Sequence, residues 1–196
     1  MKVNLRTLAG NWDEGYALDK HMISSEFRGN NEQGRPQFKS VRTEAGEATF
    51  QLKYRQVWAQ APVLAQAIAE HIFPKLQAVG LLIPMAPSTS RQRQPVTEVA
   101  NELGKLLGLQ VIDKLLSRAS GGTSLKDINT KAEKIAALTE AGFSLAESDL
   151  IGGAGRLNVL IIDDLYHTGA SMEAACAVLK THPKINKIYV AALTMR

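Results

Sequence analysis

Two kinds of apolar pattern follow one another along the chain. Short apolar runs such as 159-VLII-162 are typical of strands buried on both faces, and longer stretches carry apolar residues at helical spacing. These patterns predict strands over 78–83, 109–112, 157–162 and 187–193, and helices over 55–73, 96–108 and 169–181. Strands that alternate with helices form βαβ units, so we expect an α/β fold with a mainly parallel central sheet.

The first 50 residues have a different pattern. The segment 28–38 holds too many Gly, Asn and Pro residues for a regular element, whereas 14–27 and 47–55 alternate enough to predict short strands. We therefore interpret residues 1–51 as an N-terminal cap, and residues 52–196 as the main domain.

The composition is that of a globular protein. With 196 residues, 45% of them apolar, the chain can bury one substantial core. Its apolar runs are far shorter than the roughly 20 residues of a membrane span, and its first residues lack an apolar signal segment, so we expect a cytoplasmic protein without a membrane partner. The single cysteine, Cys176, excludes an internal disulfide and a multi-cysteine zinc site. The net charge of +4 fits an anionic ligand or nucleic acid.

Two neighbouring carboxylates, Asp163 and Asp164, directly follow the apolar run 159–162. Ligands of parallel α/β sheets bind beyond the carboxyl ends of the strands, where we expect these acids to lie. The loop after them opens a predicted helix, whose first N–H groups form a seat for an anion. Gly169 would let the backbone approach that anion, and the acids suit the vicinal hydroxyls of a ribose. The pattern therefore predicts a sugar-phosphate site.

A purely structural interpretation of this stretch stays open. The acids would then end a strand, and Thr168 or Ser171 would cap the following helix. Under the binding interpretation, the same two hydroxyl groups donate to the phosphate instead. The combination of an apolar run, two acids and a hydroxyl-and-glycine loop favours binding.

The stretch 159–171 resembles the phosphoribosyl-pyrophosphate (PRPP) signature of the type I phosphoribosyltransferases, in which a hydrophobic run, two acids and two variable residues precede a Thr-Thr-Gly loop. It departs from that signature at His167, where the first Thr is common. The resemblance narrows to the ComF-like branch through 52–72, 83–109 and 115–135. ComF-like proteins commonly begin with a cysteine zinc ribbon, which a chain with one cysteine lacks.

This resemblance implies a three-layer fold with an N-terminal hood, and an enzyme that transfers phosphoribose from PRPP to a nucleobase or amine with release of pyrophosphate. Asp163 and Asp164 would be the catalytic acids that hold the ribose hydroxyls. Mg²⁺ would be the cofactor, held mainly through the substrate, with the same two acids as candidate ligands.

The resemblance also assigns three binding segments. The 5-phosphate loop would comprise Tyr166, His167, Thr168, Gly169, Ala170 and Ser171. The pyrophosphate loop would comprise Ser88, Thr89, Ser90, Arg91 and Arg93, and the alternative that both arginines are solvated surface residues stays open. A basic lid, which begins near Arg118, would include Lys126, Lys131 and Lys134, and the alternative is a disordered polar loop. The Tyr166 side chain either faces the base or packs locally, His167 is a candidate general base, and His21 would belong to the hood or pack on the main domain.

A second class of function is a PRPP- or nucleotide-sensing protein without turnover, or one associated with DNA uptake, as ComF-like proteins are. A homodimer and a nucleic-acid partner are compatible with either class. A receiver-like phosphoacceptor is disfavoured, because that class carries its acids on separate strands and does not follow them with a T-G-x-S loop.

Overall fold

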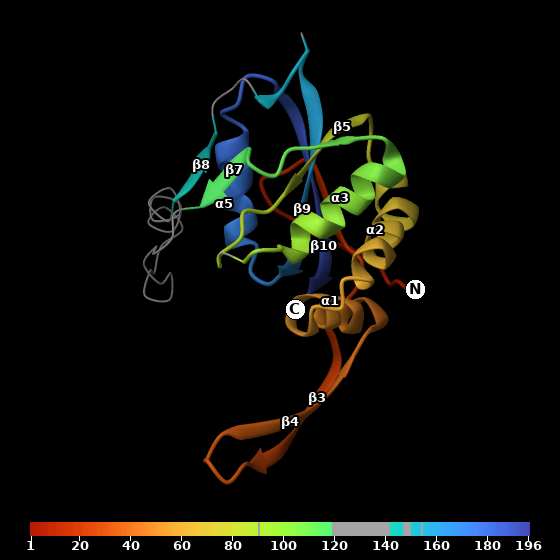
Figure 1. The fold of residues 1–196 in the computed structure, drawn as a ribbon, viewed down its shortest axis with the longest axis vertical. Helices are drawn as coiled ribbons and strands as arrows, with labels where there is room; N and C mark the ends of the chain where they lie inside the picture. The colour runs from red at the N-terminus through yellow and green to blue at the C-terminus, as the bar shows by residue number, and fades with distance from the viewer. Residues whose placement is uncertain (90, 119–141, 147–149, 154) are drawn as a thin grey trace.

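The computed structural model describes residues 1–89, 91–118, 142–146, 150–153 and 155–196 (Figure 1). Within these residues, a central sheet has six strands in the order β1-β2-β10-β9-β5-β6. These strands are β1 (Arg6–Thr7), β2 (Glu14–Ala17), β5 (Val79–Pro84), β6 (Gln110–Val111), β9 (Leu157–Tyr166) and β10 (Ile185–Met195). Neighbouring strands are parallel except for β1 and β2, which confirms the predicted α/β class with a mainly parallel sheet.

Helices cover both faces of this sheet and give three layers. The helices are α1 (Glu44–Arg55), α2 (Gln60–His71), the short 3-10 helix η1 (Phe73–Lys75), α3 (Pro95–Leu107) and α5 (Ala170–Leu179). Along β9, Val159 and Ile161 pack in the cluster that contains α5, whereas Leu160 and Ile162 pack in the cluster that contains α1, α2 and α3. Because β9 is buried on both faces, its sequence is an unbroken apolar run rather than an alternating one.

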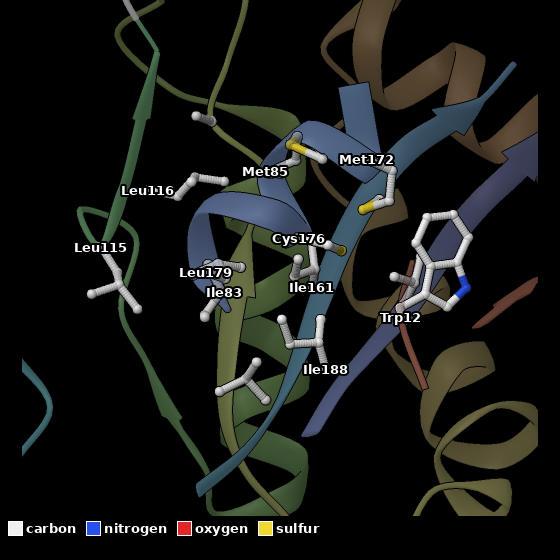
Figure 2. Packing of buried hydrophobic residues seen from close by; sticks show 14 of the residues in the cluster. Trp12, Ile83, Met85, Leu115, Leu116, Ile161, Met172, Cys176, Leu179 and Ile188 are labelled. Atoms are coloured by element: carbon white, nitrogen blue, oxygen red, sulfur yellow. The ribbon is translucent and has the colours of Figure 1, made fainter. Parts of the chain in front are cut away.

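The α5 side of the core holds the single cysteine. Figure 2 shows Cys176 beside Ile161 of β9, with Met172 one turn earlier in α5. Burial raises the pKa of the Cys176 thiol to about 12. Cys176 is therefore a packing residue, as its position in an apolar helix indicated.

The predicted strand at 47–55 is wrong, because these residues belong to α1. Thr43 caps this helix by accepting a hydrogen bond from the Gly46 N–H at 2.9 Å. The buried face of α1 has helical spacing through Ala45, Ala48, Thr49 and Leu52. The alternation of Phe50, Leu52 and Tyr54 in the sequence gave the strand prediction, but only Leu52 of these three is buried.

The N-terminal region is divided between the sheet and a projecting hairpin. Residues 6–17 contribute β1 and β2 to the central sheet, and the sequence-based boundary after residue 51 falls within α1. The antiparallel strands β3 (Met22–Asn30) and β4 (Pro36–Arg42) extend away from the rest of the molecule (Figure 1). A second small sheet pairs β7 (Leu116–Arg118) with β8 (Phe143–Leu145). Among the described residues, no helix is both long and apolar enough to span a bilayer.

Candidate functional site

Strand register decides which residues meet at the carboxyl edge of the sheet. Pro84 of β5 lies opposite Ile162 of β9, and the Met85 N–H donates to the Ile162 carbonyl at 2.8 Å. The loop that leaves β5 therefore begins beside Asp163, the next residue of β9. On the other side of β9, Ala192 of β10 lies opposite Asp163. The two acids are thus enclosed between β5 and β10 at the edge where ligands of parallel sheets bind.

A cleft of about 190 Å³ opens at this edge. Its lining includes the loop after β5, the start of α3, and Asp163, Asp164 and Ser171. Lys53 from α1 and Arg118 from β7 also line it. The cleft therefore brings two carboxylates and several cationic or hydroxyl groups into one space.

The predicted pyrophosphate loop contributes only in part to this cleft. Ser88, Thr89 and Arg91 line it, whereas Ser90 lies outside the described residues. The Arg91 guanidinium donates to the Lys53 carbonyl at 3.0 Å, which holds the loop against the end of α1.

Arg93 does not line the cleft, although the sequence places it in the same loop. Its guanidinium donates to a Glu98 carboxylate oxygen at 2.6 Å and lies 4.3 Å from the centroid of the Trp58 ring. An acid on α3 and an aromatic face therefore direct Arg93 onto the outer surface of the domain.

The start of α3 adds a feature that sequence reasoning did not assign to the site. Its N-cap residue, Gln94, makes no capping hydrogen bond through its side chain, and Pro95 at the first helical position has no N–H. Val96 and Thr97 of this first turn line the cleft. Since the first N–H groups of a helix have no intrahelical acceptor, this end of α3 is a second positive dipole facing the cleft.

The acid pair is asymmetric. The Asp164 N–H donates to Asp163 Oδ1 at 2.8 Å, and the Asp164 carboxylate forms an ion pair of 2.5 Å with Lys53 Nζ. Burial and then the charge of Asp164 raise the pKa of Asp163 to about 7, against the opposing effects of the Asp164 N–H, Lys53 and Arg118. One carboxylate is therefore paired with a cation, while its neighbour is poised to gain or lose a proton near neutral pH.

Lys53 was missed as a site residue by sequence reasoning. It stands in the last turn of α1, where a basic side chain also stabilises the helix dipole, and this position alone carries no functional signal. Its side chain reaches a carboxylate 111 positions further along the chain, and only the packing of α1 near β9 and β10 reveals the contact.

The loop after the acids forms a second hollow, of about 110 Å³, lined by residues 165–172 together with Asp163. Gly169 is the N-cap of α5 with a φ of 80°, and no side chain makes a capping hydrogen bond there. The alternative in which Thr168 or Ser171 caps the helix is thus not what the structure has. His167 and Thr168 are exposed beside this uncapped N-terminus, so the hollow has the features of an anion seat.

Tyr166 packs locally and does not line the cleft. Its hydroxyl donates to the Ala9 carbonyl at 3.2 Å, and its ring meets Trp12 edge to face with 6.1 Å between centroids. A Cβ built on Gly169 would lie 2.6 Å from the Tyr166 hydroxyl. Tyr166 therefore occupies the space that a side chain at position 169 would need, and it packs against the loop.

His21 lies close to the acid pair through a buried threonine. Thr194 Oγ1 donates to the Asp164 carbonyl at 3.0 Å and lies 3.2 Å from His21 Nδ1. Because the single hydroxyl proton is used on Asp164, this contact requires a proton on His21 Nδ1. Burial, followed by the charge of Arg42, lowers the pKa of His21. The segment before β3 is thus anchored at the same edge of the sheet as the acids.

Two further predictions concern the lid and the Mg²⁺ ion. The lid residues Lys126, Lys131 and Lys134 lie outside the described residues. Within the described ranges, no group of three or more His, Cys, Asp or Glu side chains gathers into a metal site. The cleft therefore offers a divalent cation two carboxylates at most, Asp163 and Asp164, and a ligand would have to supply other oxygens.

Comparisons with solved structures give several phosphoribosyltransferases. The adenine phosphoribosyltransferase from Thermoanaerobacter pseudethanolicus is 12% identical, and the match covers 89% of this chain and 96% of that protein, with a TM-score of 0.46. The adenine phosphoribosyltransferase from Leishmania tarentolae is 9% identical, and the match covers 98% of this chain and 79% of that protein, also with a TM-score of 0.46. A hypoxanthine phosphoribosyltransferase from Staphylococcus aureus is 14% identical over 69% of this chain and 62% of its own, with a TM-score of 0.41. No protein-family model and no curated protein sequence matches the chain. None of these three structures is described as ComF-like, so that branch stays a prediction.

Proposed function

We propose that the protein is a phosphoribosyltransferase-like enzyme that binds PRPP with Mg²⁺ and transfers its phosphoribose to a nucleobase or amine. One observation carries the proposal: the cleft and the smaller hollow meet at Asp163 and Ser171, which line both. A ligand that fills both spaces has an anion at each end and a polar linker beside two carboxylates. PRPP has a 5-phosphate, a ribose with vicinal hydroxyls and a diphosphate in that order.

In this proposal the 5-phosphate lies against the uncapped N-terminus of α5. The backbone N–H groups of the first turn and the hydroxyls of Thr168 and Ser171 would donate to its oxygens. Gly169 permits the close approach because it has no side chain to stand between the backbone and the phosphate. The ribose hydroxyls would then donate to Asp163 and Asp164, the only carboxylates that line the two spaces among the described residues.

The diphosphate would lie against the loop after β5 and the start of α3. Ser88, Thr89 and Arg91 supply donors from the loop after β5, and the start of α3 supplies a positive dipole. Lys53 and Arg118 flank the same space and add two charges. The proposal thus replaces Arg93 by Lys53 and Arg118 as the cations nearest the leaving group.

The donor set suits Mg²⁺ only as a cation bridged by substrate. Mg²⁺ usually keeps waters and substrate phosphate oxygens and takes one or two protein carboxylates, which agrees with the two acids that the cleft offers. When bound, Mg²⁺ would neutralise charge that develops on the departing pyrophosphate. Asp163 and Asp164 are the residues that would hold it, through water or directly.

In the reaction, the bond from the anomeric carbon to the diphosphate oxygen breaks, a bond from that carbon to the acceptor nitrogen forms, and the N–H proton of the acceptor is released to solvent. The ribose carries positive charge in the transition state, and the carboxylates beside it stabilise that charge. The cationic wall stabilises the negative charge that leaves with pyrophosphate. The protein's main contribution is thus to orient the ribose between two fixed and opposite charges.

The N-terminal hood remains part of the proposal. His21 is tied to Thr194, so the chain that leads into β3 rises from the edge that carries the acids. This position supports a role for the segment around His21 and for the base of the hairpin in covering the acceptor.

Titration with PRPP and MgCl₂ by calorimetry tests the proposal, followed by a screen of nucleobases and amines for pyrophosphate release. Wild-type protein should bind PRPP, and the double variant Asp163→Asn with Asp164→Asn should lose binding while its circular dichroism stays unchanged. Asp113→Asn, which removes an exposed carboxylate outside the cleft, is the matched control and should bind normally. Binding without release for every acceptor would favour a PRPP sensor, and unchanged affinity in the double variant would refute the assignment.

A further inference from the structure

A second pocket, separate from the cleft, has a volume of about 570 Å³. Its lining residues belong to three segments: Lys2, Asn4 and Arg6, then Asp19, Lys20, Met22 and Ile23, and finally Arg42, Thr43 and Glu44. We name it the α1 pocket, because the last of these segments leads into α1. None of its lining residues lines the cleft or the hollow at α5. Its volume lies within the roughly 300–1,000 Å³ that small-molecule sites usually have.

Cationic side chains dominate the lining of the α1 pocket. The four cations are Lys2, Arg6, Lys20 and Arg42. The two acids, Asp19 and Glu44, already accept hydrogen bonds of 2.7 Å from the backbone N–H groups of Lys20 and Lys2. In the part of the chain that the structure describes, no ion pair joins Lys2, Arg6 or Lys20 to a carboxylate. The pocket therefore has a net positive charge that its own acids do not neutralise.

Two of these cations carry buried donors that lack an acceptor. The Nε atoms of Arg6 and Arg42 are buried and have no hydrogen-bond partner among the described residues. Arg42 is also held in place, since its guanidinium pairs with Glu47 at 3.1 Å and lies 3.7 Å from the centroid of the Phe50 ring. Buried charged groups that lack a full set of acceptors are unfavourable, and the negative charge of a ligand in the pocket would offset part of this cost. Because Arg42 is fixed beforehand, little conformational entropy would be lost on binding.

The remaining lining of the pocket includes apolar side chains. Met22 and Ile23 border it at the start of β3, and Ile23 is 68% exposed. An inorganic anion would use the cations but leave this apolar border uncovered. A larger ligand that joins a phosphate to a flat apolar group would contact both.

We propose that the α1 pocket binds a phosphorylated ligand of nucleotide size, with its phosphate on Arg6, Lys20 and Arg42 and its base against Met22 and Ile23. This site is distinct from the proposed PRPP site and stands whether or not the protein has transferase activity.

Nuclear magnetic resonance can read the two sites separately in the full-length protein. Adenosine and guanosine 5′-monophosphates would each be titrated into ¹⁵N-labelled protein, with inorganic phosphate and the free nucleosides as partial probes. We expect at least one mononucleotide to shift the amide signals of Lys20, Met22 and Thr43 at lower concentration than phosphate or nucleoside does. Signals of Gly169 and Ser171 report independently on the proposed PRPP site.

Substitutions then assign the response. Arg6→Gln and Lys20→Gln should each weaken the response at Lys20 and Thr43 about tenfold and leave that at Gly169 unchanged. Lys20 is exposed, so its variant keeps the test valid if Arg6→Gln fails to fold. Arg28→Gln is the matched control, because Arg28 pairs with Glu26 on the hairpin and does not line the pocket. The proposal is overturned if neither nucleotide shifts these amides, if phosphate alone binds as tightly, or if Lys20→Gln leaves the affinity unchanged.

Discussion

Lys53 and Asp164 join α1 to β9 through an ion pair of 2.5 Å, with 28% and 16% of their side chains exposed. The pair lies between the acid edge of the sheet and the loop after β5, since Arg91 donates to the carbonyl of the same lysine. Lys53 is therefore placed to act both on the charge of the acids and on an anionic ligand.

Removal of this cation should change ligand binding and titration together. In Lys53→Met we expect about tenfold weaker PRPP binding, because a partly buried charge pair is worth roughly 1–2 kcal/mol. The pKa of Asp163 should rise further, since Lys53 opposes its elevation. Calorimetry and ¹³C-detected carboxyl titration measure the two effects. Lys105→Met, which removes an exposed lysine paired with Glu102 on α3, is the control and should alter neither; a Lys53→Met protein with normal affinity would show that Lys53 is not a ligand of the diphosphate.

The raised pKa of Asp163 predicts a pH-dependent stability. Its pKa is about 7 in the folded protein and 3.8 in an unperturbed carboxyl group, so the folded state binds more protons between these values. The free energy of unfolding should therefore fall as pH rises from about 4 to 7 through this group. The variant Asp163→Asn lacks this titrating group. The free energy of unfolding of the variant, relative to that of wild type, should increase by about 1–2 kcal/mol from pH 5 to pH 8, a range that is reduced for solvent screening.

Urea unfolding of both proteins at the two pH values measures this difference. Titrating groups away from the acid pair cancel in the comparison because both proteins contain them, so the difference reports on Asp163 together with Asp164, to which it is coupled. Parallel pH dependence of wild type and Asp163→Asn would contradict an elevated pKa at this position.

Gly169 and Gly34 form a matched pair of glycines with positive φ, 80° and 73°. A Cβ at Gly34 would meet nothing within 4 Å, whereas one at Gly169 would lie 2.6 Å from the Tyr166 hydroxyl. We expect Gly34→Ala to cost about 1 kcal/mol of backbone strain, and Gly169→Ala about 2–3 kcal/mol. Urea unfolding checks both values. Combining Gly169→Ala with Tyr166→Ala should make the glycine substitution less costly than it is alone; an undiminished cost would mean that Tyr166 is not the obstacle.

Arg91 and Arg93 test the assignment of the loop after β5. Arg91 lines the cleft, but Arg93 is engaged by Glu98 and Trp58 outside it. Arg91→Ala should lower PRPP affinity about tenfold through loss of a charge-assisted contact, and Arg93→Ala should change it less than threefold. Equal losses in the two variants would show that the loop rearranges on binding and that both arginines reach the ligand.

Several parts of the fold were predictable because local patterns carry them. The unbroken apolar run of β9 identified a central strand, and the stripe through Val99, Leu103 and Leu107 identified α3. Helix α1 was predicted as a strand because the alternation of Phe50, Leu52 and Tyr54 obscured the helical spacing of its buried residues. Strand alternation and helix periodicity both fit a stretch of nine residues, and the packed face decides between them.

The geometry of the candidate site could be predicted where chemistry and position coincide in one segment. Asp163, Gly169 and Ser171 are contiguous with a strand and a helix start, and the structure brings them to adjoining hollows. Lys53 required a contact between distant segments, and the orientation of Arg93 depends on Trp58 and Glu98, which the loop sequence does not indicate. Local sequence thus predicts the backbone at the site better than it predicts the side chains that other elements deliver.

The pairing of β2 with β10 has a consequence for the order in which the chain folds. A hydrogen bond from the Ile188 N–H to Asp13 spans 175 positions, and β10 is the one parallel neighbour that β2 has among the described residues. While the ribosome is still extending the nascent polypeptide, β2 must wait for β10 to emerge, and its open edge is a target for chaperones or for mispairing. Late pairing of β2, only after β10 has been synthesised, is the expected course for this chain.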